Sequence, residues 1–97
     1  MALRDAILTL TEHWPDVERR LSTEQGRALV RAMRSLAQEP DDEDLMFEVV
    51  TLLVPVLPRQ HPVFEAILIE DVRSTATPRV WARTIERLRE IAAESRW

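Results

Sequence analysis

Residues 22–38 read STEQGRALVRAMRSLAQ, and this stretch decides the fold class. Ser22 and Gln25 fit a capping box, in which the Ser22 side chain accepts the N–H of Gln25 and the Gln25 side chain reaches back to Ser22. Apolar residues then recur at the three- and four-residue spacing of one helix face. They are Leu29, Met33, Leu36 and Ala37. The stretch therefore predicts an amphipathic α-helix that ends near Gln38.

The preceding segment, residues 3–21, also has a helical period. Its apolar residues are Leu3, Ile7, Leu10 and Trp14. Trp14-Pro15 should end or bend this helix, because a residue before proline is pushed out of the α region. Pro15 suits the first turn of a second short helix that runs to about Leu21. The sequence leaves open whether one kinked helix or two helices result.

The segment that follows starts with the acidic turn Pro40-Asp41-Asp42-Glu43-Asp44. Acidic residues in a first helical turn favour the positive end of the helix dipole. Residues 45–54 are apolar nearly all round, which predicts a helix in the middle of a bundle or in a subunit interface. Pro55 and Pro58 should bend or stop this helix.

Two further helices are expected in the last third of the chain. Pro62 can start a helix over residues 63–72, although their composition also suits a strand; a lone strand would lack a partner. Thr77-Pro78 fits an N-cap followed by the first helical position, and the last helix runs from there almost to Trp97. We expect an all-α protein, with residues 1–97 forming a single compact bundle of four to six helices with a long C-terminal helix.

Composition excludes several kinds of chemistry. The 97 residues include no Cys, one Gly and two His, which removes thiol chemistry, Cys-based zinc sites and glycine-rich phosphate loops. His13 and His61 both stand next to features that define helix ends. We therefore predict a non-enzymatic protein without cofactor or metal. All 13 basic residues are Arg, which a GC-rich genome explains more readily than Arg-specific recognition does.

Charge is segregated along the chain although the total is only −4. Residues 38–48 hold six acidic residues and no basic one, whereas residues 21–37 and 73–97 are both net positive. Such charge either complements helix dipoles and keeps the surface soluble or forms contact surfaces. The second interpretation predicts docking of a protein partner, which includes a second copy in a homo-oligomer. The candidate contact residues are Arg27, Arg31, Arg34, Asp41, Asp42, Glu43, Asp44, Arg83, Arg87 and Trp97.

Other partners are less favoured by the sequence. The stripe Arg27, Arg31 and Arg34 gives residues 22–36 the look of a DNA-recognition helix, but nucleic-acid binding usually needs a clear basic excess. An antitoxin-like or inhibitor protein that covers an enzyme's site is a further alternative. Residues 49–58 are the longest apolar stretch and are too short to span a bilayer. We expect a cytoplasmic protein with no membrane partner. A terminal Trp97 either frays or packs on a neighbouring helix or a second subunit.

A family resemblance rests on residues 20–66. It is carried by Leu21 to Gln25, a helix rich in Ala, Arg and Leu, a Pro-Asp-Asp turn, and the motif Leu57-Pro58-x-x-His61-Pro62. This pattern resembles small α-helical effector-associated domains of actinobacterial conflict systems. These are death-domain-like adaptors that work by homotypic helical contacts. The resemblance implies an adaptor function and no catalytic residues.

Overall fold

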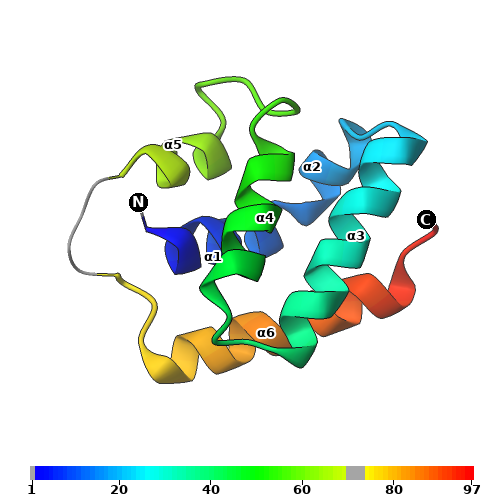
Figure 1. Ribbon diagram of the computed structural model, residues 1–97. Helices are drawn as coiled ribbons and strands as arrows, with labels where there is room; N and C mark the ends of the chain where they lie inside the picture. The colour runs from blue at the N-terminus through cyan, green and yellow to red at the C-terminus, as the bar shows by residue number, and fades with distance from the viewer. Residues whose placement is uncertain (1, 70–73) are drawn as a thin grey trace.

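The computed structural model describes residues 2–69 and 74–97, which form six α-helices and no strand (Figure 1). The last helix is the longest, so the predicted all-α architecture with a long C-terminal helix is confirmed. The helices are α1 (Leu3–Glu12), α2 (Trp14–Arg19), α3 (Thr23–Gln38), α4 (Glu43–Leu53), α5 (Pro62–Leu68) and α6 (Pro78–Glu94).

Side-chain caps mark where four of the helices begin, namely α3, α4, α5 and α6. The capping box before α3 is present: Ser22 Oγ accepts from Gln25 N at 3.2 Å, and Gln25 Oε1 accepts from Ser22 N at 2.9 Å. Thr77 Oγ1 accepts from Val80 N at the start of α6, and Asp42 caps α4. Each such cap contributes about 1 kcal/mol. The predicted starts at Ser22 and Thr77 are thus confirmed.

Two helices are separated at His13, just before the Trp14-Pro15 step. His13 ends α1 with φ −109° and ψ 18°, and Trp14 already belongs to α2, where Pro15 occupies the first turn. Trp14 is buried and belongs to the core, as its place on the apolar stripe predicts. Of the two alternatives that the sequence leaves open, one kinked helix or two helices, the structure has two helices with a one-residue break at His13.

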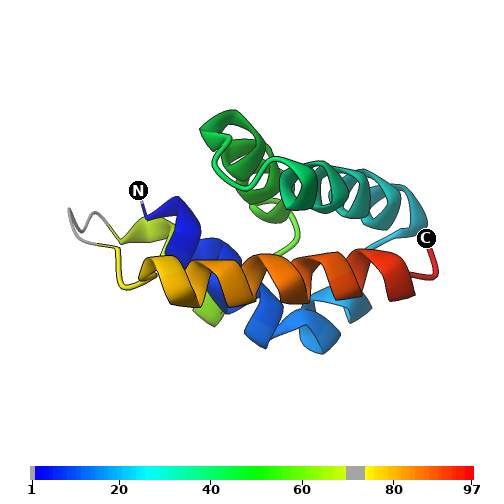
Figure 2. The ribbon, with the colours of Figure 1, turned by 90° about the horizontal axis from the view of Figure 1, so that it is seen from below.

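The core lies where α1 meets the other helices. α1 packs against α4, α5 and α6, and Ala6, Ile7 and Leu10 on it are fully buried. α3 packs against both α4 and α6. Figure 2 shows α3 and α4 on one side of α6 and α2 on the other, with α1 crossing behind α6. The radius of gyration is 12.1 Å, close to the roughly 12.5 Å expected of a compact chain of this length.

The predicted position of residues 45–54 in the middle of the bundle is wrong. α4 lies on the front of the molecule in Figure 1 and buries one face through Met46, Val49, Val50 and Leu53. Phe47 is 53% exposed and Val54 43% exposed. The reason is that α1 and α3 cover α4 from one side only. The alternative of a subunit interface for this helix remains a prediction.

Of the two C-terminal helices, α5 is shorter than predicted, whereas α6 runs almost to Trp97 as predicted. Residues 62–68 are helical, so the strand alternative is wrong there, but α5 ends at Leu68 and Ile69 is already extended. The rest of the predicted range, residues 70–72, lies outside the described residues. α6 ends at Glu94, because Ser95 turns to an extended conformation, and Trp97 follows outside the helix.

The turn between α3 and α4 is tied to α6 and α1. Trp81 Nε1 on α6 donates to the carbonyl of Pro40 at 3.1 Å. The Arg4 guanidinium lies 5.1 Å from the Trp81 ring centroid and 3.5 Å from Asp41 Oδ1. These long-range contacts hold the acidic turn in place at one end of the molecule.

Candidate protein-binding surface

The outward face of α4 combines an aromatic ring with carboxylates. Asp44, Phe47 and Glu48 stand at i, i+3 and i+4, so the helical period places them on one face. All three side chains are exposed. No ion pair is found for Asp44 or Glu48 among the described residues. We call these three residues the α4 face.

The acidic turn contains residues with different roles. Asp42 Oδ1 accepts from the N–H groups of Asp44 and Leu45 at 2.9 and 3.2 Å, so this carboxylate caps α4. Asp41 is 91% exposed and touches only Arg4 among the described residues. Glu43 and Asp44 lie exposed in the first helical turn. Of the four predicted acidic contact residues, Asp42 is therefore engaged in the fold and the other three face solvent.

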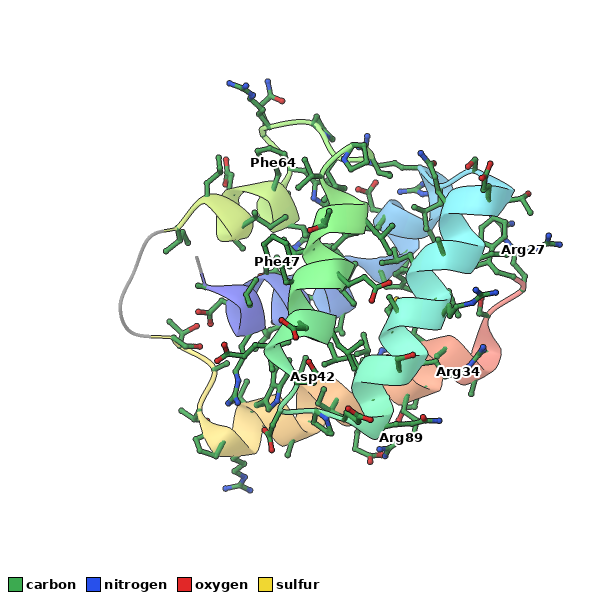
Figure 3. The ribbon with its side chains drawn as sticks, in the orientation of Figure 1. Arg27, Arg34, Asp42, Phe47, Phe64 and Arg89 are labelled. Carbon is green, nitrogen blue, oxygen red and sulfur yellow. The ribbon has the colours of Figure 1, made fainter. Side chains whose placement is uncertain are left out.

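Further apolar side chains are exposed on α5, at its end away from α4 (Figure 1). Leu68 and Ile69 at the end of α5 are exposed, and Phe64 on α5 is half-buried against the core. Figure 3 shows Phe47 on the side of α4 that faces α5. Phe64 lies at the end of α5 that is nearer to α4. Single exposed apolar residues are ordinary on a protein surface. Several of them on neighbouring helices are typical of a contact surface.

The arginines predicted as contacts on α3 are exposed, and one of them is engaged with α6. Arg27 and Arg31 make no ion pair among the described residues. Arg34 Nη2 donates to the carbonyl of Ala92 at 2.9 Å. Figure 3 shows Arg27 and Arg34 along the edge of α3 that lies away from Phe47. The arginine stripe and the α4 face thus lie on different sides of the molecule's front.

A small pocket opens between the C-terminal ends of α3 and α6. Its volume is about 220 Å³, and its lining is formed by Arg34, Ala37, Gln38, Arg89, Ala92 and Ala93. Arg89 Nη2 donates to the carbonyl of Ala37 at 3.1 Å. These hydrogen bonds hold both guanidinium groups at the pocket, and the three alanines Ala37, Ala92 and Ala93 form the apolar part of its lining, which we call its floor. We call this the Arg34–Arg89 pocket.

The two predicted arginines on α6 line a second hollow, which is wider and more open. This groove of about 320 Å³ lies between α1 and α6 and is lined by Leu8, Thr11, Glu12, Val80, Arg83, Thr84 and Arg87. Arg87 is already paired with Glu90 at 3.2 Å, and Glu12 adds a negative charge to the groove. The groove is thus less positive than its two arginines suggest.

Trp97 packs on the chain's one glycine. An ideal Cβ on Gly26 would lie 2.5 Å from Trp97 Cδ2, so only a residue without a side chain leaves room for the ring. The Arg96 guanidinium covers the ring with its carbon 4.4 Å from the centroid. Trp97 Nε1 is buried without an acceptor among the described residues. Of the alternatives for Trp97, the structure has the ring packed on a neighbouring helix of its own chain.

His61 and Asp16 form a polar cluster beneath the start of α5. His61 is buried; its Nε2 lies 2.6 Å from Asp16 Oδ2, and its Nδ1 accepts from Val63 N. These bonds place the proton of the neutral ring on Nε2. Hydrogen bonds from His61 and Arg20 lower the pKa of Asp16 from 3.8 to about 2. His61 Nε2 thus joins the start of α5 to α2, while Nδ1 caps the first turn of α5.

Two general features concern metals and membranes. Within residues 2–69 and 74–97, no three His, Asp or Glu side chains gather where they would hold a metal ion. Over the same residues, none of the helices has both the length and the apolar composition needed to cross a bilayer.

Sequence reasoning missed Arg89 and Phe47 as candidate contact residues. Arg89 stands three residues after Glu86 and pairs with it, so by spacing it looks like an ordinary surface ion pair. Phe47 lies within an apolar run, where nothing local distinguishes an exposed ring from a buried one. The spacing of Phe47 from Asp44 and Glu48 was the one available signal.

The chain was compared with protein-family models, with curated proteins and with solved structures. No family model matches, and neither of the other two searches finds a match.

Proposed function

We propose that the protein is a non-enzymatic, helical protein–protein interaction module of the adaptor type, and that it associates with copies of itself. The observation that carries this proposal is the α4 face, where a Phe ring that is 53% exposed stands beside two carboxylates that form no ion pair within the described residues. A helix that keeps an aromatic ring in water gains free energy when a partner covers that ring. Covering the exposed half of a Phe side chain contributes on the order of 1 kcal/mol.

The distribution of charge supports a second copy as the partner. The acidic residues gather in the turn before α4 and on α4, and exposed arginines line α3 and α6. A chain that carries both signs on separate surfaces offers each copy a complementary surface on the next. Complementary charge mainly selects the partner and speeds encounter, while the apolar contact supplies much of the affinity.

The first test is the mass of the protein in solution. Light scattering coupled to size-exclusion chromatography should show a mass that rises with protein concentration. Reversal of Glu43 and Asp44 to Arg should weaken this association, whereas Asp42 stays unchanged in the variant because it caps α4. The matched control is Glu65→Arg, a charge reversal at an exposed position on α5. A wild-type protein that stays monomeric up to its solubility limit contradicts self-association.

The arginine stripe on α3 supports one alternative, a small DNA-binding regulator. Arg27 and Arg31 are exposed and free of ion pairs within the described residues, so they are available to phosphates. An electrophoretic shift series at low and raised salt separates the two functions, because phosphate binding weakens steeply with salt. Strong, salt-sensitive DNA binding that Arg27→Ser and Arg31→Ser remove would favour the regulator.

A further inference from the structure

We propose that the α4 face of one molecule docks into the Arg34–Arg89 pocket of a second copy. The Phe47 ring lies on the alanine floor, and the Asp44 and Glu48 carboxylates meet the two guanidinium groups. This inference rests on the self-association proposed above and names the two surfaces that form the contact.

The pocket has the chemistry that such a face requires. Its floor is apolar, formed by Ala37, Ala92 and Ala93, and its volume is about 220 Å³. A guanidinium group binds a carboxylate through parallel N–H donors and also stacks on an aromatic ring. A ligand that combines one aromatic ring with carboxylates therefore matches both the alanines and the arginines of the lining.

The two arginines are held in place before any partner arrives. Arg34 donates to Ala92 O and Arg89 donates to Ala37 O, each with one terminal nitrogen. A guanidinium group has five N–H donors, so each arginine keeps donors for a partner, although Arg89 shares its group with Glu86. Side chains already ordered by such bonds lose less conformational entropy on binding.

The α4 face matches this arrangement by its spacing. Asp44 and Glu48 are one helical turn apart, and Phe47, three residues after Asp44, flanks them on the same broad face. The two carboxylates therefore stand together beside the ring, where they can reach guanidinium groups while the ring makes the apolar contact. Both are free of ion pairs within the described part of the chain, so docking breaks no existing contact of that kind.

A second copy is the occupant that the molecule's layout favours. In Figure 3, Phe47 lies on the α5 side of α4, whereas Arg34 and Arg89 lie at the ends of α3 and α6 on the opposite side. The two surfaces therefore do not satisfy each other within one molecule. They do so between two molecules, and the opposite charges then meet. A contact this small belongs with transient interfaces, so high protein concentration is needed to observe it.

The test uses two full-length variants, each of which disables one surface. Phe47→Glu replaces the exposed ring on the α4 face. Ala93→Glu places a carboxylate inside the pocket, where it pairs with the resident arginines and leaves their backbone contacts intact. Each variant alone should associate at least about tenfold more weakly than wild type in a light-scattering dilution series. The controls are Ala82→Glu and Arg79→Ser, changes at exposed positions of α6 outside the pocket, which should associate like wild type.

Mixing the two variants makes the result decisive. The intact α4 face of the Ala93→Glu variant should dock into the intact pocket of the Phe47→Glu variant. An equimolar mixture should then form a one-to-one complex with the mass of two chains, although neither variant associates well alone. Thermal denaturation of each variant checks that both are folded.

The remaining outcomes overturn the inference in distinguishable ways. A monomeric wild type overturns it together with the proposed self-association. A wild type that associates while either variant keeps its full affinity overturns the pocket contact and leaves self-association standing. Two weakened variants that form no complex on mixing show that these surfaces do not meet each other.

Discussion

Arg34 and Arg89 cap each other's helices. Arg34 on α3 donates to Ala92 O in the last turn of α6, and Arg89 on α6 donates to Ala37 O in the last turn of α3. The carbonyls of a last helical turn have no partner within the helix and carry the negative end of its dipole. The two arginines thus neutralise two helix ends and join them with a reciprocal pair of hydrogen bonds.

Loss of these caps should lower the free energy of unfolding. We expect Arg34→Met and Arg89→Met each to cost about 0.5–1.5 kcal/mol, because Met keeps the apolar stem and removes the donor. Urea denaturation measures the change. Arg31→Met is the matched control on α3, since Arg31 is exposed and makes no hydrogen bond among the described residues. Equal stability of the Arg31, Arg34 and Arg89 variants would show that the caps contribute nothing.

The contact between Gly26 and Trp97 predicts that the effect of Gly26→Ala on stability depends on whether Trp97 is present. Alanine in place of glycine inside a helix normally stabilises by about 1 kcal/mol. In this chain a Cβ on Gly26 displaces the Trp97 ring, so Gly26→Ala should gain little or lose stability. In a Trp97→Ala background the same Gly26→Ala change should stabilise by about 1 kcal/mol. Thermal denaturation of the four proteins measures this cycle, and additive effects would show that the ring does not occupy the position above Gly26.

The lowered pKa of Asp16 predicts how stability responds to acid. Hydrogen bonds from His61 and then Arg20 bring the pKa of Asp16 to about 2 in the folded chain, from 3.8. A carboxyl whose pKa is lower in the folded state stabilises the fold above its unfolded pKa. That contribution is lost as pH falls from about 4 to about 2. Asp16→Asn should therefore be less stable than wild type at neutral pH, and the difference should shrink in this window.

Urea denaturation at a series of pH values tests the Asp16 prediction. Arg20→Met removes the second-largest cause of the low pKa of Asp16. The variant should therefore lose less stability than wild type as the pH falls from about 4 to about 2. Curves for wild type and Asp16→Asn that stay parallel from pH 5 to 2 would contradict the low pKa.

The acidic turn predicts unequal effects at adjacent residues. Asp42→Ala should destabilise the fold by about 1 kcal/mol, because the start of α4 loses its cap. Asp41→Ala should change stability little, since Asp41 is 91% exposed and its single contact with Arg4 is 3.5 Å long. A shift of the denaturation midpoint by several degrees for Asp42→Ala and almost none for Asp41→Ala is expected. Equal shifts would contradict the separate roles of the two carboxylates.

Local features of the fold were predictable from the sequence, because their causes lie within a few residues. The capping box at Ser22, the Pro-initiated helices and the buried stripe of α6 with Trp81 and Leu88 all follow from spacing and backbone preference. Helix ends were less predictable: nothing in the composition of residues 63–72 indicates that α5 ends at Leu68.

Long-range features of the candidate site were not predictable. Arg34 and Ala92 are 58 residues apart, and so the pocket that they help to line has no signature in any short stretch. The exposure of Phe47 depends on how many helices cover α4, which its composition does not specify. Asp44 and Arg34 were identified as contact candidates from charge alone, whereas the ring and the second arginine needed the arrangement of helices.

The hydrogen bond from Trp81 to the Pro40 carbonyl makes the start of α4 depend on the folded position of α6. It joins α6 to the turn that begins α4, across 41 residues of chain. An isolated peptide carrying residues 39–54 would lack this anchor, and a helix as short as α4 is marginal in water by itself. Truncation of α6 should therefore abolish the proposed binding through α4, and it would also remove the part of the Arg34–Arg89 pocket that α6 carries. Under the proposed function, the acidic, aromatic-bearing segment would therefore recognise a partner only as part of the folded protein.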